Sequence, residues 1–163
     1  MKRDGYIAAA NFFNRYPTLK KTAVITQKTA EILIYITYPV FIAILLFKGN
    51  LFWVKSLVVC GIGFIAVSLF RHLYNAERPY QRYDIKPLIN KKSLGKSFPS
   101  RHCFSAAVIA VSISAINLPI GIIIGVFALL IATLRVAFGV HFIKDVLCGL
   151  SLGILIGAIQ YFI

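Results

Sequence analysis

The sequence predicts an all-α protein that crosses a membrane several times, as a polytopic helix bundle. Hydrophobic residues make up 59% of the 163 residues, and the mean hydropathy is +0.81, whereas ordinary soluble domains contain roughly 45–50% apolar residues. The apolar residues gather in runs near the length of about 20 that a helix needs to cross a hydrocarbon core. Short polar segments and turn residues separate these runs, so we expect one membrane-embedded domain.

The first 22 residues differ from the rest of the chain in their distribution of charge. Apolar residues recur there at roughly helical spacing among basic side chains, namely Tyr6, Ile7, Ala10 and Phe13. This pattern predicts an amphipathic helix that lies in the membrane interface, and we expect Pro17 to end it. We therefore divide the chain into an interfacial segment, 1–22, and a membrane-embedded domain, 23–163. No cleavable signal peptide is expected, because Asn11 and Asn14 interrupt the apolar stretch early.

Five membrane crossings are expected in the remaining chain. They are residues 23–47, 51–70, 100–117, 119–140 and 145–163. The one substantial loop, 71–98, is rich in Lys and Arg, and loops of that length are usually functional or mobile. Glycines recur every four residues in the last two crossings, a spacing that lets helices pack closely in lipid. They are Gly121 and Gly125, and then Gly149, Gly153 and Gly157.

Most polar residues near the apolar spans fall into three clusters. They are Arg71, His72, Glu77, Arg78 and Pro79; Pro99, Ser100, Arg101 and His102; and Arg135, His141 and Asp145. Charged groups beside apolar spans are costly and by default suggest function. His102 lies 16 residues before the reversal at Leu118, and Arg135 lies 17 residues after it. At about 1.5 Å per helical residue, each leg is roughly 25 Å long, so the chain returns to the depth of His102 at Arg135. The three clusters are therefore expected on one side of the membrane.

The third cluster suggests a histidine with a carboxylate partner. His141 and Asp145 are four residues apart, so they share a face if this segment is helical. A carboxylate that accepts from one ring nitrogen leaves the other nitrogen with a lone pair, as a nucleophile or a base. A metal site and a structural histidine are the alternatives. A metal is disfavoured because the neighbouring arginines repel cations and the chain has only three histidines.

The second cluster suggests an anion site at the start of a helix. Ser100 precedes an apolar helix and is a natural N-cap. The N-terminus of a helix favours an anion, Arg101 adds hydrogen-bond donors, and His102 can supply a proton.

The first cluster adds two more arginines. Arg71 and Arg78 are seven residues apart, two helical turns, so we expect them to point the same way, with Pro79 ending their helix. A guanidinium group can donate two parallel hydrogen bonds to the oxygens of one phosphate. Phosphoryl transfer requires above all that the phosphoryl group be positioned and its charge neutralised. With Arg101 and Arg135, the four arginines are expected to form an oxyanion clamp; solvated charges at a membrane boundary are the alternative.

The three clusters resemble the signature of the type 2 phosphatidic acid phosphatase superfamily, which includes bacterial lipid phosphatases and vanadium haloperoxidases. That signature is a basic residue, six others and Arg-Pro; then Pro-Ser-x-His; then Ser-Arg, five others, His, three others and Asp. The corresponding segments here are 71–79, 99–102 and 135–145, in the right order and spacing. The resemblance covers about residues 30–163.

The resemblance implies a metal-independent phosphatase that needs no cofactor. His141 would be the nucleophile that forms a phosphohistidine, Asp145 would orient it, and His102 would be the general acid. The phosphate-binding residues would be Arg71, Arg78, Ser100, Arg101 and Arg135. Three positions depart from the commonest pattern, with Arg71 in place of Lys, Arg101 in place of Gly, and Leu134 in place of Ser. Superfamily members commonly have six crossings, so a sixth is possible here.

The expected partners are the bilayer and a lipid phosphate. The formal charge is +13, with 18 basic and 5 acidic residues. Nucleic acid is disfavoured because the basic residues lie in short connections between apolar runs, whereas anionic lipids attract such residues. Candidate substrates are undecaprenyl pyrophosphate, phosphatidylglycerophosphate and phosphatidic acid. Loop residues that could select among headgroups are Asp84, Lys86, Lys91 and Lys92. The oligomeric state has no indicator in the sequence.

The side of the membrane on which the clusters lie has conflicting indicators. All the basic residues except Lys48 and Lys55 lie on or beside the side that carries the clusters, and the positive-inside rule then predicts a cytoplasmic site. The resemblance to bacterial lipid phosphatases of the cell membrane implies an external site, which we expect here. The alternative function is a non-catalytic anion- or lipid-phosphate-binding membrane protein or transporter; haloperoxidase activity is disfavoured because those relatives are soluble.

Overall fold

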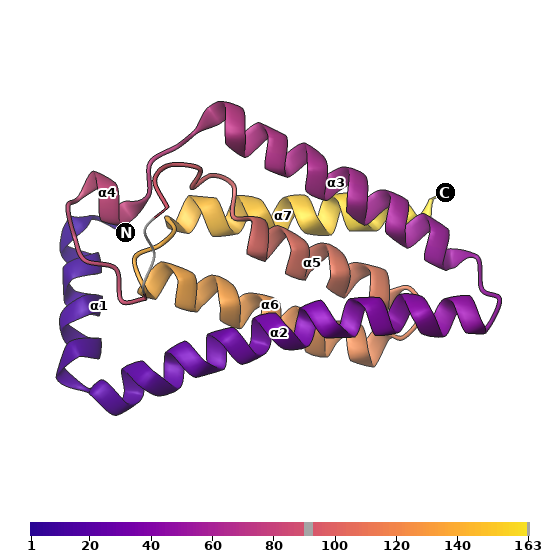
Figure 1. Ribbon diagram of the computed structural model, residues 1–163, viewed down its shortest axis with the longest axis horizontal. Helices are drawn as coiled ribbons and strands as arrows, with labels where there is room; N and C mark the ends of the chain where they lie inside the picture. The colour runs from indigo at the N-terminus through magenta and orange to yellow at the C-terminus, as the bar shows by residue number, and fades with distance from the viewer. Residues whose placement is uncertain (90–92, 163) are drawn as a thin grey trace.

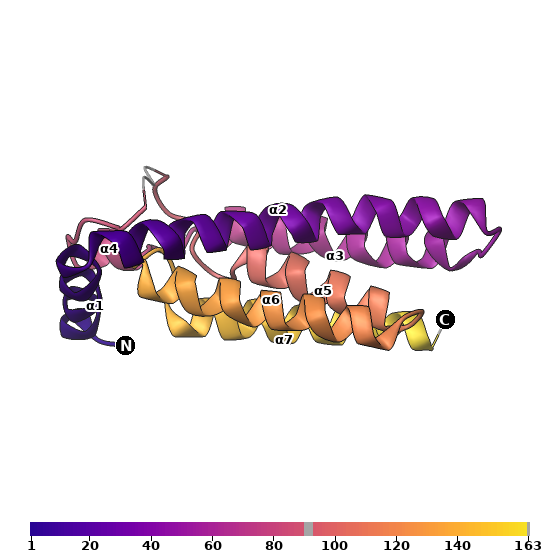
Figure 2. The ribbon, with the colours of Figure 1, turned by 90° about the horizontal axis from the view of Figure 1, so that it is seen from below.

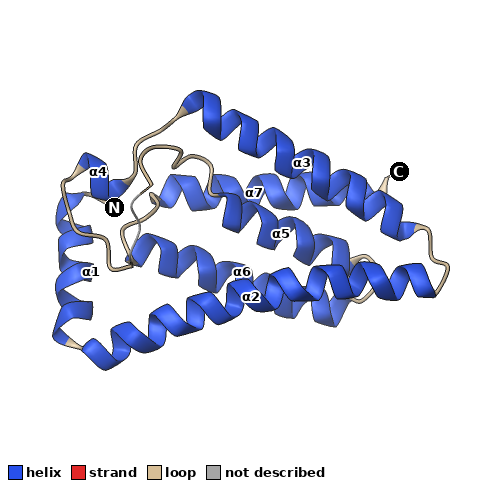
Figure 3. Ribbon diagram, in the orientation of Figure 1, coloured by secondary structure: helices blue, strands red, loops and turns tan. Residues whose placement is uncertain are grey.

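The computed structural model describes residues 1–89 and 93–162, and every regular element within these ranges is a helix (Figure 1, Figure 3). The helices are α1 (Arg3–Arg15), α2 (Pro17–Phe47), α3 (Phe52–Tyr74), α4 (Pro79–Arg82), α5 (Arg101–Ser114), α6 (Leu118–Ala137), α7 (Ile143–Ala158) and the 3₁₀ helix η1 (Ile159–Tyr161). The all-α class is therefore confirmed. Lys91 and Lys92 lie outside the described residues, as does Ile163 at the end of the fifth predicted crossing.

Within the described residues, four segments are long and apolar enough to cross a membrane, and they begin at Pro17, Phe52, Leu118 and Ile143. Their mean hydropathies range from 1.6 to 2.5, and only 22–33% of their most apolar stretches is buried. The apolar side chains that remain exposed suit contact with lipid. The third predicted crossing, 100–117, corresponds to α5, which has 14 residues, fewer than the roughly 20 that a hydrocarbon core requires. A sixth crossing has no counterpart in the described residues, because α1 has only 13.

The short helix α5 lies at the centre of the bundle. Ten of its 14 residues are buried, and Figure 2 shows it between a layer formed by α2 and α3 and a layer formed by α6 and α7. In Figure 1, α2 and α3 approach each other where they are joined and splay apart toward the end that carries α4. The core packs Phe104 and Ile113 of α5 against Ile34 of α2 and Ile131 of α6.

Glycines bring α7 and α6 close to α5. A Cβ atom at Gly149 would lie 2.5 Å from the carbonyl oxygen of Ser100, and one at Gly153 would lie 2.6 Å from that of Phe104. At Gly121 a Cβ would lie 2.6 Å from the backbone of Ser114. The predicted packing role of the glycine spacing is thus confirmed at these positions. It is wrong for Gly125, where no described atom lies within 4 Å of a Cβ.

The N-terminal helix differs from its prediction at one boundary. α1 ends at Arg15, and Pro17 begins α2 instead of ending the first helix. Proline is well suited to the first position of a helix, because the N–H that it lacks would have no intrahelical partner there. The first predicted crossing therefore starts six residues too late, whereas the other boundaries of the crossings agree within four residues when η1 is counted with α7.

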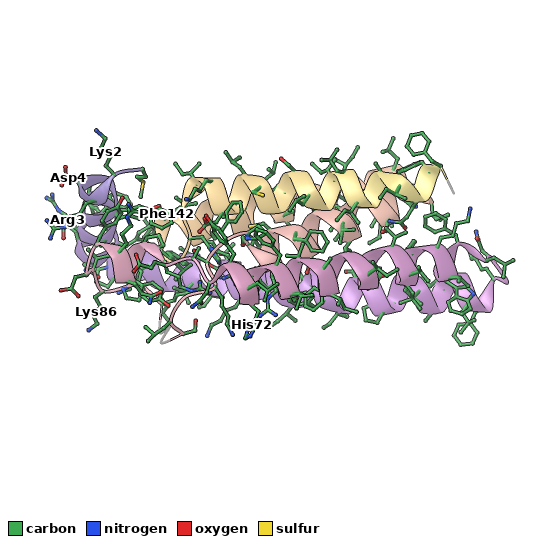
Figure 4. All side chains as sticks on the ribbon, turned by 90° about the horizontal axis from the view of Figure 1, so that it is seen from above. Lys2, Arg3, Asp4, His72, Lys86 and Phe142 are labelled. Carbon is green, nitrogen blue, oxygen red and sulfur yellow. The ribbon has the colours of Figure 1, made fainter. Side chains whose placement is uncertain are left out.

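α1 runs across one end of the bundle (Figure 1). Tyr6 is 1% exposed and its ring contacts the rings of Tyr83 and Phe142. In Figure 4, the charged residues at the start of α1 project from the outer side of this helix, while Phe142 lies on its inner side; the charged residues are Lys2, Arg3 and Asp4. α1 is therefore anchored to the bundle as well as amphipathic, and its position in a membrane interface stays a prediction.

Candidate active site

The three polar clusters meet at the end of the bundle that α1 covers. Arg71 lies in the last turn of α3 and Arg135 in the last turn of α6, while Asp145 lies in the first turn of α7. Six of the predicted site residues are at most 5% exposed: Arg71, Arg78, Ser100, Arg135, His141 and Asp145. Burial of this many polar groups requires that they bind one another, the backbone or a ligand.

The two arginines of the first cluster do not share a helix, contrary to the prediction. α3 ends at Tyr74, and Asn75 follows in the left-handed conformation with φ 44°. Pro79 starts α4 instead of ending a helix that contains Arg78. Asparagine tolerates the left-handed conformation, so the chain turns after Tyr74. Arg71 and Arg78 nevertheless converge, because both donate to the carbonyl oxygen of Lys96.

These two arginines hold the segment 95–99, which leads into α5. Arg71 also donates to the carbonyl oxygens of Ser97, at 3.1 Å, and Pro99. Arg78 also donates to those of Gly95, at 3.0 Å, and Val140, at 3.1 Å. A guanidinium group has five N–H donors, and each arginine uses three here. Each can therefore position the segment and still offer donors to an anion.

His141 and Asp145 are paired, although His141 lies outside any helix. It occupies the turn before α7, and its Nδ1 is 3.4 Å from Oδ2 of Asp145. The same Oδ2 accepts from the backbone N–H of Phe142 at 3.0 Å. The contact that the sequence predicted is present, but a turn and the start of α7 produce it instead of one helical face.

Ser97 is a site residue that sequence reasoning missed. It is fully buried, its hydroxyl donates to Oδ2 of Asp145, and its Oγ is 3.3 Å from Nδ1 of His141. Its nearness to Pro99 in the sequence was the one available signal. The hydroxyl helps to hold both partners of the pair in place.

Burial lowers the pKa of His141 to about 4, and the positive charges of Arg78 and Arg135 act in the same direction, while Asp145 opposes them. The ring is therefore neutral near pH 7. With Nδ1–H directed at Asp145, the lone pair lies on Nε2, and this tautomer follows from the hydrogen-bond partners. A neutral, buried and oriented imidazole is suited to act as a nucleophile.

Among the predicted site residues, three buried polar atoms have no hydrogen-bond partner within the described ranges: Oδ1 of Asp145, Oγ of Ser100 and Nε of Arg135. Oδ1 of Asp145 accepts hydrogen bonds, whereas the atoms of Ser100 and Arg135 can donate. Ser100 occupies the predicted N-cap position of α5, but its side chain makes no capping hydrogen bond. An unsatisfied buried donor or acceptor costs about 1–3 kcal/mol, so the two donor atoms are suited to receive the oxygen atoms of a ligand. Arg135 donates through Nη2 to Oε1 of Glu31 at 2.6 Å.

The remaining two predicted residues lie nearer the surface of the site. Arg101 is exposed and its guanidinium lies 5.7 Å from the ring centroid of Phe64. It lines a cavity of about 350 Å³ with other cationic or titratable residues, namely Arg71, His72, Arg78 and Lys96. His102 is half-buried, with its ring 6.5 Å from that of Tyr35. Sequence reasoning gave no role to Lys96, although it lies beside the second cluster.

No three His, Cys, Asp or Glu side chains come together as a metal site would require, within the part of the chain that the structure describes. Metal independence stays a prediction that chelation can test.

Comparison with known proteins identifies the family. Residues 52–163, more than half of the chain, match the PAP2 superfamily. The chain belongs to the PAP2 superfamily. The resemblance seen in the sequence motifs is thus confirmed, and the PAP2 match begins at Phe52, so α1 and α2 lie outside it.

Relatives within the PAP2 superfamily support this assignment. Phosphatidylglycerophosphatase B of Bacillus subtilis is 41% identical over 86 residues, which cover 46% of this chain and 41% of that protein. The match therefore spans less than half of the relative's length. The crystal structure of Aquifex aeolicus LpxE has a TM-score of 0.74 at 25% identity, covering 91% of this chain and 88% of that one. The transmembrane PAP2-type phosphatidylglycerolphosphate phosphatase of Bacillus subtilis has a TM-score of 0.72 at 27% identity, covering 98% and 82%.

Proposed function

We propose that this chain is an integral membrane lipid phosphatase that hydrolyses a phosphate monoester or pyrophosphate through a phosphohistidine at His141, without a metal. One observation carries the proposal. A buried, neutral histidine is paired with Asp145 and Ser97, beside guanidinium groups that retain unused donors. Membership of the PAP2 superfamily supports the same activity.

In the first step, Nε2 of His141 attacks phosphorus, so that an N–P bond forms as the bond from phosphorus to the leaving oxygen breaks. His102 gives a proton to that oxygen, and Asp145 stabilises the positive charge that develops on the imidazole. In the second step, water attacks phosphorus and the N–P bond to His141 breaks, while His102 accepts the proton of the water. Inorganic phosphate then leaves and the enzyme is regenerated.

The arginines and the start of α5 neutralise the phosphoryl oxygens in both steps. Preorganised donors aimed at developing charge are usually the largest catalytic effect. The donors would come from Arg71, Arg78, Arg101 and Arg135, with the hydroxyl of Ser100 and the first N–H groups of α5. Phosphoryl transfer requires that the phosphoryl group be positioned and its negative charge neutralised, and these positively charged donors would do both.

An apolar cavity beside the phosphate site supports a lipid as the substrate. It has a volume of about 270 Å³ and lies among α2, α3 and α5, lined by residues that include Tyr35, Tyr38, Gly61, Phe64 and Phe104. Tyr35 contacts His102, and Phe64 contacts Arg101, so the cavity adjoins the phosphate-binding end. A lipid chain in this cavity would place its phosphate at the arginines.

Three lipid phosphates remain candidates: phosphatidylglycerophosphate, phosphatidic acid and undecaprenyl pyrophosphate. The names of two relatives support phosphatidylglycerophosphate first. Assay of the purified protein in detergent against these three lipids, with EDTA present, distinguishes them. We expect phosphate release that survives chelation and is blocked by vanadate.

His141→Ala and a matched control, Lys48→Ala at the far reversal, complete the experiment. We expect His141→Ala to abolish phosphate release and Lys48→Ala to leave it unchanged. Labelled substrate should also leave an acid-labile phosphoprotein in wild type and none in His141→Ala. Release of no phosphate from any lipid, or wild-type rates in His141→Ala, would instead favour a non-catalytic anion- or lipid-phosphate-binding protein or a transporter.

The proposed location is the cell membrane, with the site on the external face. The resemblance to bacterial lipid phosphatases supports this orientation, and the concentration of basic residues on the same side opposes it. Single cysteines introduced at Asp4 and Asn50, in a background that lacks the three native cysteines, test it with a membrane-impermeant thiol reagent on intact cells. We expect labelling at position 4 only; labelling at position 50 only would place the site in the cytoplasm.

A further inference from the structure

A carboxylate on α2 lies against the active site. Of the five acidic residues in the sequence, only Glu31 and Asp145 lie within the described helices α2, α3, α6 and α7. Asp145 is already paired with His141. Ionised groups within membrane spans are rare, costly and usually paired, so the second carboxylate requires a reason of its own.

Glu31 is held on both sides by polar side chains. Its Oε1 accepts from Nη2 of Arg135 at 2.6 Å and from Nε2 of Gln27 at 2.8 Å. The side chain of Arg135 is 4% exposed and that of Glu31 is 19% exposed. Because Gln27 is itself 3% exposed, these three groups form a partly buried chain of hydrogen bonds from α2 to α6.

The contact occupies only part of the Arg135 guanidinium. Glu31 binds Nη2, while Nε is buried without a partner among the described residues. A guanidinium is planar and rigid, so fixing one nitrogen also directs the other two. Arg135, in the last turn of α6, lies at the same end of the bundle as Arg71, in the last turn of α3, and like charges that lie near one another repel. A carboxylate partner opposes this repulsion at Arg135.

We propose that Glu31 is a positioning residue that holds the guanidinium of Arg135 in the orientation required by the phosphoryl group in the transition state. This inference rests on the proposed phosphatase activity and deepens it. α2 lies outside the segment that matches the PAP2 superfamily, so Glu31 is a residue of the site that the matched segment does not contain. Glu31 also borders a small gap with Tyr35 and His102, which places it near the general acid as well.

The decisive variant is Glu31→Gln, which keeps the size of the side chain and an amide oxygen but removes the charge. Loss of a group that orients a binding residue lowers activity about 10- to 100-fold in comparable metal sites, and we expect a decrease of that size in kcat. KM should stay constant or fall, because one negative charge leaves an anion-binding site. Asp4→Asn is the matched control, since Asp4 is exposed on α1 and loses the same charge.

A double-mutant cycle tests whether Glu31 acts through Arg135. In an Arg135→Ala background, Glu31→Gln should change kcat less than twofold, because residues in one interaction are not additive. An equal decrease in both backgrounds would overturn the inference. So would a wild-type kcat in Glu31→Gln, or a higher kcat/KM, which would make Glu31 a competitor of the phosphate.

A binding measurement separates this inference from the proposed function. Vanadate resembles the transition state of phosphoryl transfer, whereas inorganic phosphate resembles the ground state. In Glu31→Gln we expect the ratio of vanadate to phosphate affinity to fall at least fivefold, with no change in Asp4→Asn. An unchanged ratio would overturn the role of Glu31. A wild-type protein that releases no phosphate would overturn the proposed function while the affinity ratio still decides the positioning role.

Discussion

The hydroxyl of Ser97 donates to the same carboxylate oxygen of Asp145 that lies 3.4 Å from Nδ1 of His141. The backbone N–H of Phe142 donates to this oxygen as well. Three donors from two segments thus converge on one atom. This arrangement fixes the carboxylate against the imidazole, and it places Ser97, on the segment held by Arg71 and Arg78, in contact with the nucleophile.

Ser97→Ala should lower kcat about tenfold and leave KM nearly unchanged. The substitution removes one donor to Asp145, which allows the His141 ring to reorient, but it touches no phosphate oxygen in the proposed mechanism. Steady-state kinetics in detergent, with thermal unfolding of the same sample, checks this. A loss of thermal stability without a change in kcat would show that Ser97 only supports the fold.

Asp145→Asn should reduce kcat by roughly 10³-fold or more, because the amide can hold His141 in the wrong tautomer. The side chain keeps its size, so the loss of stability should be much smaller than the loss of turnover. Parallel measurements of kcat and Tm test this expectation. Equal thermal and catalytic losses would favour a structural role for the pair.

The His141 side chain should make the folded state less stable in acid. Its pKa is about 4 in the folded protein against about 6.5 in an unfolded chain. As the pH falls from 6.5 toward 4, the unfolded state binds a proton that the folded state excludes, so the free energy of unfolding decreases. The decrease in Tm between pH 7.5 and pH 5 should therefore be smaller in His141→Gln than in wild type. Identical decreases would contradict a lowered pKa.

Tyr6→Phe should decrease both stability and turnover modestly. The Tyr6 hydroxyl donates to the carbonyl oxygen of His141 at 3.3 Å, and burial raises the pKa of Tyr6, so the phenol remains protonated as a donor. Loss of one such hydrogen bond costs about 0.5–1.5 kcal/mol, and we expect kcat to fall severalfold. Tyr16→Phe is the control, because Tyr16 is exposed. Equal effects of the two substitutions would argue that the contact with His141 has no role in turnover.

Gly61→Leu should raise KM for long-chain lipid phosphates and leave hydrolysis of a short-chain phosphate unchanged. Gly61 lines the apolar cavity, and a Cβ there would meet no described atom within 4 Å, so the larger side chain can fill the cavity without displacing the helices. Gly125→Leu on α6 has equal room and lies outside that cavity. A rise in KM for both chain lengths would indicate a general distortion of the site.

Much of the architecture follows from the sequence because it depends on local patterns. Apolar runs of membrane length predicted α3, α6 and α7 closely, and the motif spacing predicted the pairing of His141 with Asp145. The family assignment followed from the same motifs. The break at Pro17 was also visible, but proline can end one helix or begin the next, and the sequence pattern did not distinguish these outcomes.

Tertiary structure alone decided the contacts that complete the site. Glu31 and Arg135 are 104 residues apart, and Tyr6 and His141 are 135 apart, so no helical period relates them. Arg71 and Arg78 converge on the carbonyl oxygen of Lys96 because the chain turns at Asn75. The sequence by itself determined the helices and the chemical groups of the site, since hydropathy and spacing are local. Packing of α1, α2 and segment 95–99 against the bundle determined which groups orient the nucleophile and the arginines. A buried polar group needs a hydrogen-bond partner, and the tertiary structure decides which residue lies close enough to be that partner.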